Sequence, residues 1–379
     1  MTYFTEYFLN NIWTFQDNIV FSPFSLHSAT AIATLGATFN SVTQLELLSL
    51  YGTSFEDIFA LRDSYTKIIQ DLSNYPETLS FANGIWANRK IFQAMKIPFK
   101  RTVEDDFGGK VDDLERRRPQ NEINQFLRDK TKGKVSNIWK RIDSDLIIVN
   151  AGFFKAAWIE KFQPFGSLFF TKSDGKKVKT RFMIRESEEN KLFFYNFPLL
   201  RTEGVANLTC LTIPYENDRF EMIILMPQDP NHLNRINNQL HERTAFDQDK
   251  KSLFLSDVFN KVDRNSFDNF EVIMPEFKID YEVEAQKVFR QMGAIQAFEN
   301  GAELKGISEN TQVKIDQIMH KASIEVTENG TEGTASTSFT TRSESLSPPR
   351  VIIDKPFMFF VRDHETGVVL LAGKYTDPQ

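Results

Sequence analysis

The residues best able to take part in chemistry lie in one long segment between Thr327 and Pro349. This segment is rich in Thr, Ser and Gly and contains a single basic residue, Arg342, which is followed by Ser343. A basic side chain fills the specificity pocket of trypsin-like proteases, so the Arg342–Ser343 peptide bond is a candidate substrate for such an enzyme.

The rest of the sequence offers little catalytic apparatus. It contains no Gly-x-Ser-x-Gly, His-Glu-x-x-His, phosphate-loop or paired-cysteine metal motif, and its five histidines are spread along the chain. A lone cysteine, Cys210, excludes an internal disulfide framework. The sequence therefore predicts no enzyme activity, no metal and no cofactor.

The composition excludes several other classes of protein. Hydrophobic residues make up 41% of the chain and charged residues 25%, which is ordinary for a globular protein with a sizeable core. The 36 Phe are scattered and are expected to fill that core. A net charge of −6 argues against nucleic-acid binding, and a solvated turn explains the short basic run at 116–118 as well as any ligand does.

No membrane segment or secretion signal is predicted. No run approaches the roughly 18 apolar residues that a membrane span needs. The first residues, Met1 to Phe4, lack the charged and apolar regions of a signal peptide. Two locations stay open: the protein is cytoplasmic if it is made without a signal, and extracellular if a signal has been removed.

The order of periodic segments predicts a mixed α/β chain. Helical spacing of Phe4, Phe8 and Ile12 predicts an opening helix, and Ser25 is expected to cap a second helix running through Leu35. Further helices are predicted over 121–130 and 282–292. Strands are predicted over 79–87, 146–154, 208–214, 220–226, 272–277, 351–353, 357–361 and 368–372. Because no repeat or linker divides these elements, we expect one domain over residues 1–379.

The segment after Thr327 has the residue pattern of a strand, although its length and composition predict a loop. Loops this long in compact proteins are usually functional or disordered. From 331 to 342, one alternate set of residues is uncharged and mostly small, and the other set carries both charges, Glu332 and Arg342. A period of two indicates a strand with one buried face, so the segment is predicted to have two states. The alternative is a plain Ser/Thr-rich loop in which the charges share a face by chance.

Several motifs, found in order from about Tyr3 to Pro378, resemble the serpin family of serine-protease inhibitors. They are Asn18 to Ser25, Asn150 with Trp158, Leu211 to Tyr215, Gly293 to Phe298, Glu328 to Thr337, Asp354 to Phe357, and Ala372 to Lys374. The resemblance implies an α+β fold of three sheets and about nine helices, with an exposed reactive-centre loop at about 328–349. It also implies a suicide substrate, in which the cleaved loop inserts into the central sheet and traps the protease as an acyl-enzyme.

The resemblance also assigns roles to particular residues. The hinge of the loop is expected at Glu328, Gly330, Thr331, Gly333, Ala335 and Thr337. A polar "shutter" beneath the opening strands is expected from Ser22, Ser25, Asn150 and His320, and Trp158 is expected at the "breach", where insertion begins. The alternative for each of these residues is a satisfied buried side chain without such a role.

The reactive bond has three candidates. Family spacing from Glu328 gives Glu344–Ser345, and counting back from Pro348–Pro349 gives Ser345–Leu346. The preference of trypsin-like proteases for a basic side chain gives Arg342–Ser343. We expect Glu344–Ser345, with Arg342–Ser343 as the runner-up.

A non-inhibitory serpin, acting as a carrier, chaperone or storage protein, is the rival function. Such proteins typically carry bulky, charged or Pro residues on the inserting face, and this hinge does not. Heparin binding is not expected, because the stretch before Leu79 holds only Arg62 and Lys67 as cations. Asn329 and Asn207 begin glycosylation sequons, and a glycan on Asn329 would obstruct insertion.

Overall fold

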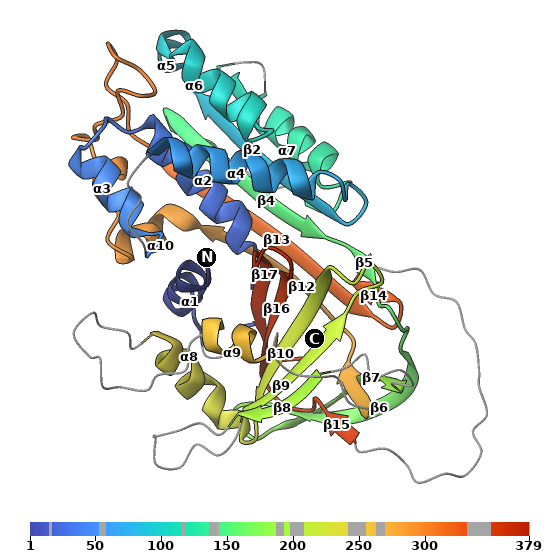
Figure 1. Ribbon diagram of the computed structural model, residues 1–379. Helices are drawn as coiled ribbons and strands as arrows, with labels where there is room; N and C mark the ends of the chain where they lie inside the picture. Colours follow the sequence, from blue (N-terminus) through green and yellow to red (C-terminus); the bar gives the residue numbers. More distant parts are fainter. Residues whose placement is uncertain are drawn as a thin grey trace.

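The computed structural model (Figure 1) describes residues 1–14, 17–52, 58–115, 118–135, 142, 144–186, 193–197, 208–241, 255–262, 270–331 and 350–378. These residues form ten α-helices, which agrees with the resemblance's expectation of about nine: α1 Thr2–Asn11, α2 Pro23–Gly36, α3 Val42–Ser49, α4 Ile58–Leu72, α5 Arg89–Ala94, α6 Ile97–Arg101, α7 Pro119–Lys130, α8 Leu233–His241, α9 Leu255–Val262 and α10 Ala285–Gln291. The short helices are η1 Thr102–Asp106, η2 Pro230–His232 and η3 Gln296–Phe298.

The described strands form the three sheets that were expected. The central sheet has the order β3 Lys110–Asp113, β2 Leu79–Ala87, β4 Leu146–Phe154, β13 Gln317–Thr327, β14 Gly330–Thr331 and β5 Ala156–Ala157, with β12 Phe277–Glu284 paired to β13. The second sheet is β1 Ile19–Phe21, β17 Val369–Tyr375, β16 Phe357–Asp363, β10 Phe220–Pro227, β9 Leu208–Pro214 and β8 Phe193–Phe197. The third is β15 Arg350–Ile352, β11 Glu271–Pro275, β7 Lys177–Glu186 and β6 Gln163–Thr171.

The middle of the central sheet contains one parallel pair of strands. β4 is buried along its whole length, antiparallel to β2 and parallel to β13, with Ile147 opposite Gln317 and Phe153 opposite Ser323. Parallel pairing is slightly less stable per residue than antiparallel pairing. The boundary between β4 and β13 is therefore the weaker seam in the middle of this sheet.

Helix α2 packs against β2 and β4 and also against β17 of the second sheet. Its cap is Ser22 and not Ser25 as predicted, because the Ser22 hydroxyl accepts from the backbone N–H of Ser25 at 3.3 Å, and Pro23 begins the helix. Gly152 on β4 permits this close approach, since a Cβ there would lie 2.5 Å from that of Ser22. The helix start is thus held directly against the middle of the sheet.

Several predicted boundaries differ from the structure. The single strand expected over 272–277 is two strands, β11 and β12, separated at Glu276. The helix expected from 282 begins at Ala285, because residues up to Glu284 pair with β13. The hairpin of β6 and β7 was not predicted, since most of β6 is exposed and interrupted by Pro164 and Gly166.

The predicted loop starts later than expected. Residues 330–331 form β14, which pairs antiparallel with both β13 and β5 at one end of the central sheet (Figure 1). Asn329, Gly330 and Thr331 are buried. The expectation that the whole of 328–349 is exposed is therefore wrong for these residues, because they already complete part of the sheet.

Candidate functional site

Three polar side chains form a row across the middle of the central sheet. The strand register places Asn83 opposite Asn150, and Asn150 opposite His320. Asn150 Nδ2 donates to Asn83 Oδ1 at 2.6 Å, and Asn150 Oδ1 lies 2.7 Å from His320 Nδ1. All three are buried, with Asn83 2% exposed. The row therefore crosses the parallel seam between β4 and β13.

His320 is a neutral hydrogen-bonding group in this row. Its Nε2 accepts from the backbone N–H of Ser22 at 2.9 Å, so the ring proton lies on Nδ1 and is donated to Asn150 Oδ1. Burial lowers the pKa of His320 to about 3, because the imidazolium would lose its hydration. A second ring proton would also remove the acceptor that Ser22 uses.

Ser22 and Ser25 connect the row to α2. The Ser25 hydroxyl donates to the carbonyl of Ala151 at 3.0 Å, and the Ser25 carbonyl accepts from Asn150 Nδ2 at 2.8 Å. The structure thus brings together the four predicted residues, and with Asn83 they form what we call the polar cluster. Asn83 was missed, although an amide inside the apolar strand 79–87 was a visible signal. Separation of β4 from β13 must break the bond between His320 and Asn150.

Trp158 lies at the end of the central sheet where β14 is inserted. Its indole stacks on the ring of Tyr215, with centroids 4.5 Å apart and planes 9° from parallel. Its Nε1 donates to the carbonyl of Thr327 at 3.0 Å. This hydrogen bond therefore fixes the last residue of β13 to the residue that directly follows β5.

We call residues Thr327 to Thr331 the hinge turn. The hydroxyl of Thr331 lies 2.8 Å from the hydroxyl of Tyr215, and both side chains are fully buried. Gly330 has φ of +145°, and a Cβ there would collide with the carbonyl of Ala156. Only glycine fits this position, because other residues are strained in such a conformation and would also meet that carbonyl.

Two backbone bonds join the hinge turn to the segment after β5. The N–H of Trp158 donates to the carbonyl of Asn329 at 3.1 Å, and that of Phe162 donates to the carbonyl of Glu328 at 2.8 Å. Thr331, which was expected in the hinge of an exposed loop, is already paired with β13 and β5 in the central sheet. Any residue added to this strand would therefore follow Thr331.

Some predicted residues lie outside the described part of the chain. They are Gly333, Ala335, Thr337 and the candidate bond residues Arg342, Ser343, Glu344 and Ser345. Asn207 also lies outside it. Asn329 is described and only 7% exposed, so its side chain is poorly placed to carry a glycan while the hinge turn is docked.

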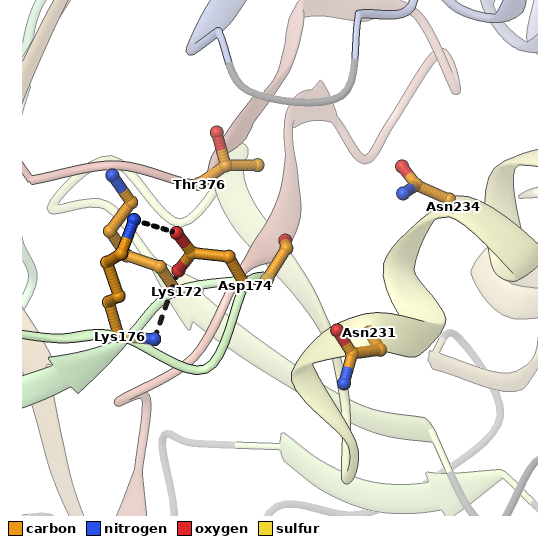
Figure 2. A pocket seen from close by; sticks show the side chains of 7 residues that line it. Lys172, Asp174, Lys176, Asn231, Asn234 and Thr376 are labelled. Carbon is orange, nitrogen blue, oxygen red and sulfur yellow. Dashed lines mark hydrogen bonds and ion pairs between the residues drawn. The ribbon is translucent and has the colours of Figure 1, made fainter.

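The described residues show no second site with comparable features. The cavity in Figure 2, about 330 Å³ in volume, has lysines that are already paired, Lys176 with Asp174 and Lys172 with Asp377. Within the described segments no cluster of His, Cys, Asp and Glu could hold a metal ion. None of the described helices is long and apolar enough to cross a membrane. Cys210 is buried, which raises the pKa of its thiol.

Comparison with known proteins agrees with this geometry. The model of the serpin (serine protease inhibitor) family matches residues 5–378. The chain is 27% identical over 381 residues to neuroserpin of Homo sapiens, covering 96% of this chain and 87% of neuroserpin. It is 28% identical over 387 residues to Serpin-Z1A of Triticum aestivum, covering 95% and 90%.

Solved structures show the same fold. Native protease nexin-1 with heparin matches with a TM-score of 0.81 and 22% identity, covering 100% of this chain and 98% of that one. The thermophilic serpin tengpin in its native state matches with a TM-score of 0.82 and 20% identity, covering 100% and 93%. The chain belongs to the serpin family.

Proposed function

We propose that this serpin inhibits a serine protease as a suicide substrate, by inserting its cleaved loop between β4 and β13. The observation that carries the proposal is β14, which is antiparallel to its neighbours β13 and β5. A strand continuing from Thr331 would run antiparallel to both β4 and β13. Insertion would replace one parallel pairing by two antiparallel pairings, which supplies a driving force.

The register of β14 can be extended along both neighbours. Thr331 is opposite Val326 and Ala156, so the same register would place Ala335 opposite Ala322 and Gly152. It would place Thr337 opposite both His320 and Asn150, which pair with each other in the uncleaved protein. The hydroxyl of Thr337 could then donate to one partner and accept from the other, satisfying groups that insertion would separate.

The same register also determines how far along β4 the inserted strand would reach. It would place Thr341 opposite Leu146, the first residue of β4. A protease bound to Glu344 or Arg342 would then lie just beyond the far end of the sheet. Glu344–Ser345 stays our proposed reactive bond, and the amino terminus of the fragment released from the trapped protease would distinguish it from Arg342–Ser343.

Heparin is not part of the proposal. The structural relative with heparin is protease nexin-1, and that ligand belongs to that protein. In α4 of this chain the cations are Arg62, which is paired with Asp63 at 2.9 Å, and Lys67, so this helix carries no cluster of positive charge. The non-inhibitory alternative predicts cleavage without insertion.

Thermal unfolding tests the insertion step. Cleavage in the loop should raise the melting temperature far beyond the roughly 2–4 °C that 1 kcal/mol produces in chains of 150–250 residues. The new strand would add backbone hydrogen bonds and buried surface. An unchanged melting temperature after clean cleavage, with both fragments still bound, would favour the non-inhibitory alternative.

A further inference from the structure

One face of the hairpin formed by β6 and β7 carries a row of cations. Lys177, Lys179 and Arg181 occupy alternate positions of β7, and all three side chains are exposed. The two residues between them are half-buried. Since side chains two residues apart point to the same face of a strand, the three cations lie together on the outward face and span about 13 Å.

Neighbouring carboxylates compensate little of this positive charge. No ion pair of the two lysines of the row is found in the described part of the chain. Arg181 lies 3.9 Å from Glu276, but its side chain is 82% exposed, so water and salt screen this pair. At the tip of the hairpin, Asp174 is paired with Lys176 at 2.9 Å. The row is therefore a local positive charge on a chain whose net charge is −6.

An exposed aromatic ring lies beside the cations. The register of the hairpin places Phe169 directly opposite Lys179, so the ring shares the outward face. Phe169 is 59% exposed, and Phe165 on the same strand is 39% exposed. Among the described strands β6 is an edge of the third sheet and pairs only with β7. We call Lys177, Lys179, Arg181 and Phe169 the basic face.

The basic face belongs to the sheet that the chain enters directly after the loop. That sheet contains β15, which begins at residue 350, together with β11, β7 and β6 (Figure 1). Val351 is opposite Val272, which is opposite Arg185, so β15 lies two strand spacings, or about 10 Å, from β7. Lys179 lies about 20 Å along β7 from Arg185. A protease domain of about 200 residues has a radius of gyration of about 16 Å, so a protease on the loop would be wide enough to reach this face.

We propose that the basic face docks an acidic surface of the protease that attacks the loop. The cations attract such a surface before the loop enters the active site, because complementary charge steers encounter and raises association rates. Phe169 supplies apolar contact area among the charges once the two surfaces meet. This inference deepens the proposed function, on which it rests for the identity of the partner, and adds that proteases with an acidic surface near the active site are the ones engaged fastest.

Rates of attack on the loop at low and high salt test this docking. The double variant Lys177→Glu/Lys179→Glu is compared with the wild type using two serine proteases that cut the same bond, one with an acidic and one with a basic surface. In about 0.1 M salt the acidic protease should attack the variant severalfold more slowly, and the basic protease should not. In about 1 M salt the difference should vanish, because the screening length falls from about 10 Å to about 3 Å. Both lysines are exposed, so the variant should keep the fold.

The double variant Lys90→Glu/Lys305→Glu is the matched control. It makes the same change in net charge at exposed lysines outside the third sheet, and it should be attacked at the wild-type rate. The rate counts trapped and merely cleaved protein together, so it tests docking even if no protease is trapped and the proposed inhibition fails.

Three results would overturn the docking surface. The first is an equal rate for the Lys177/Lys179 variant and the control. The second is a loss of rate that persists in high salt or is the same for both proteases. The third is weaker retention of the variant on a sulfated polysaccharide with unchanged rates of attack, which would assign the basic face to a polysaccharide partner.

Discussion

The hydroxyl of Tyr215 lies 2.8 Å from the hydroxyl of Thr331, and this bond joins the end of the second sheet to the first loop residues held in the central sheet. Neither side chain is exposed to solvent. Stacking of Trp158 on the Tyr215 ring fixes the orientation of the phenol. These contacts therefore hold β14 in place in the central sheet, and under the proposed mechanism insertion would continue this existing strand.

The effects of removing the two partners of this hydrogen bond on the free energy of unfolding should not add. Tyr215→Phe leaves the Thr331 hydroxyl buried without a partner and should lower the free energy of unfolding by about 1–3 kcal/mol. Thr331→Val alone should have a similar effect on the Tyr215 hydroxyl. The double variant should be less destabilised than the sum of the two, as chemical denaturation of all four proteins would show. Additive effects would mean that the two hydroxyls do not interact.

The inward face of the inserting strand can be tested at Thr337. Because the extended register places Thr337 over His320 and Asn150, Thr337→Arg should force a charge against the buried polar cluster and stop trapping, while cleavage of the loop continues. Ser338→Arg has the opposite parity and is the matched control, which should trap normally. Equal trapping by the two variants would show that the register of β14 does not continue. Thr331→Arg is less informative, since Thr331 is already buried before cleavage.

The strands that the sequence predicts best are those whose burial follows from their own composition. The segments 79–87, 146–154 and 208–214 match β2, β4 and β9, because apolar runs between turn residues leave few alternatives. The strands β6 and β7 have many exposed positions and carry no such signal. They are held by pairing with each other and with β11, which a local pattern does not report.

The candidate site also contains residues that the sequence predicts and contacts that only the folded structure reveals. The resemblance names Ser22, Ser25, Asn150 and His320, and the structure brings them together. The docking of Thr331 was not predicted, since it depends on Tyr215, more than a hundred residues away in the sequence.

His320 should make stability depend on pH below neutrality. Its pKa in the folded protein, about 3, lies below the ordinary value of 6.5, so the unfolded chain binds the extra proton first. The stabilisation is fully present above about pH 6.5 and should fall by about 1.4 kcal/mol for each pH unit below it.

The comparison with His320→Asn isolates this effect from other titrating groups. The difference in free energy of unfolding between wild type and variant should shrink as pH falls from 7 to 4.5. His27 is also buried with a lowered pKa, but it is present in both proteins and cancels. A difference that stays constant with pH would contradict the neutral state of His320 in the folded protein.

Formation of a covalent complex tests the proposed inhibition most directly. The uncleaved protein is incubated with a panel of serine proteases of differing specificity, and each mixture is separated by electrophoresis under denaturing conditions. At least one protease should give a band near the sum of the two masses that survives denaturation, because the ester to the protease serine persists once the loop has inserted. The same protease should give only cleaved protein with Thr337→Arg. Rapid cleavage of the wild-type loop by every protease in the panel, with no such band, would contradict the account.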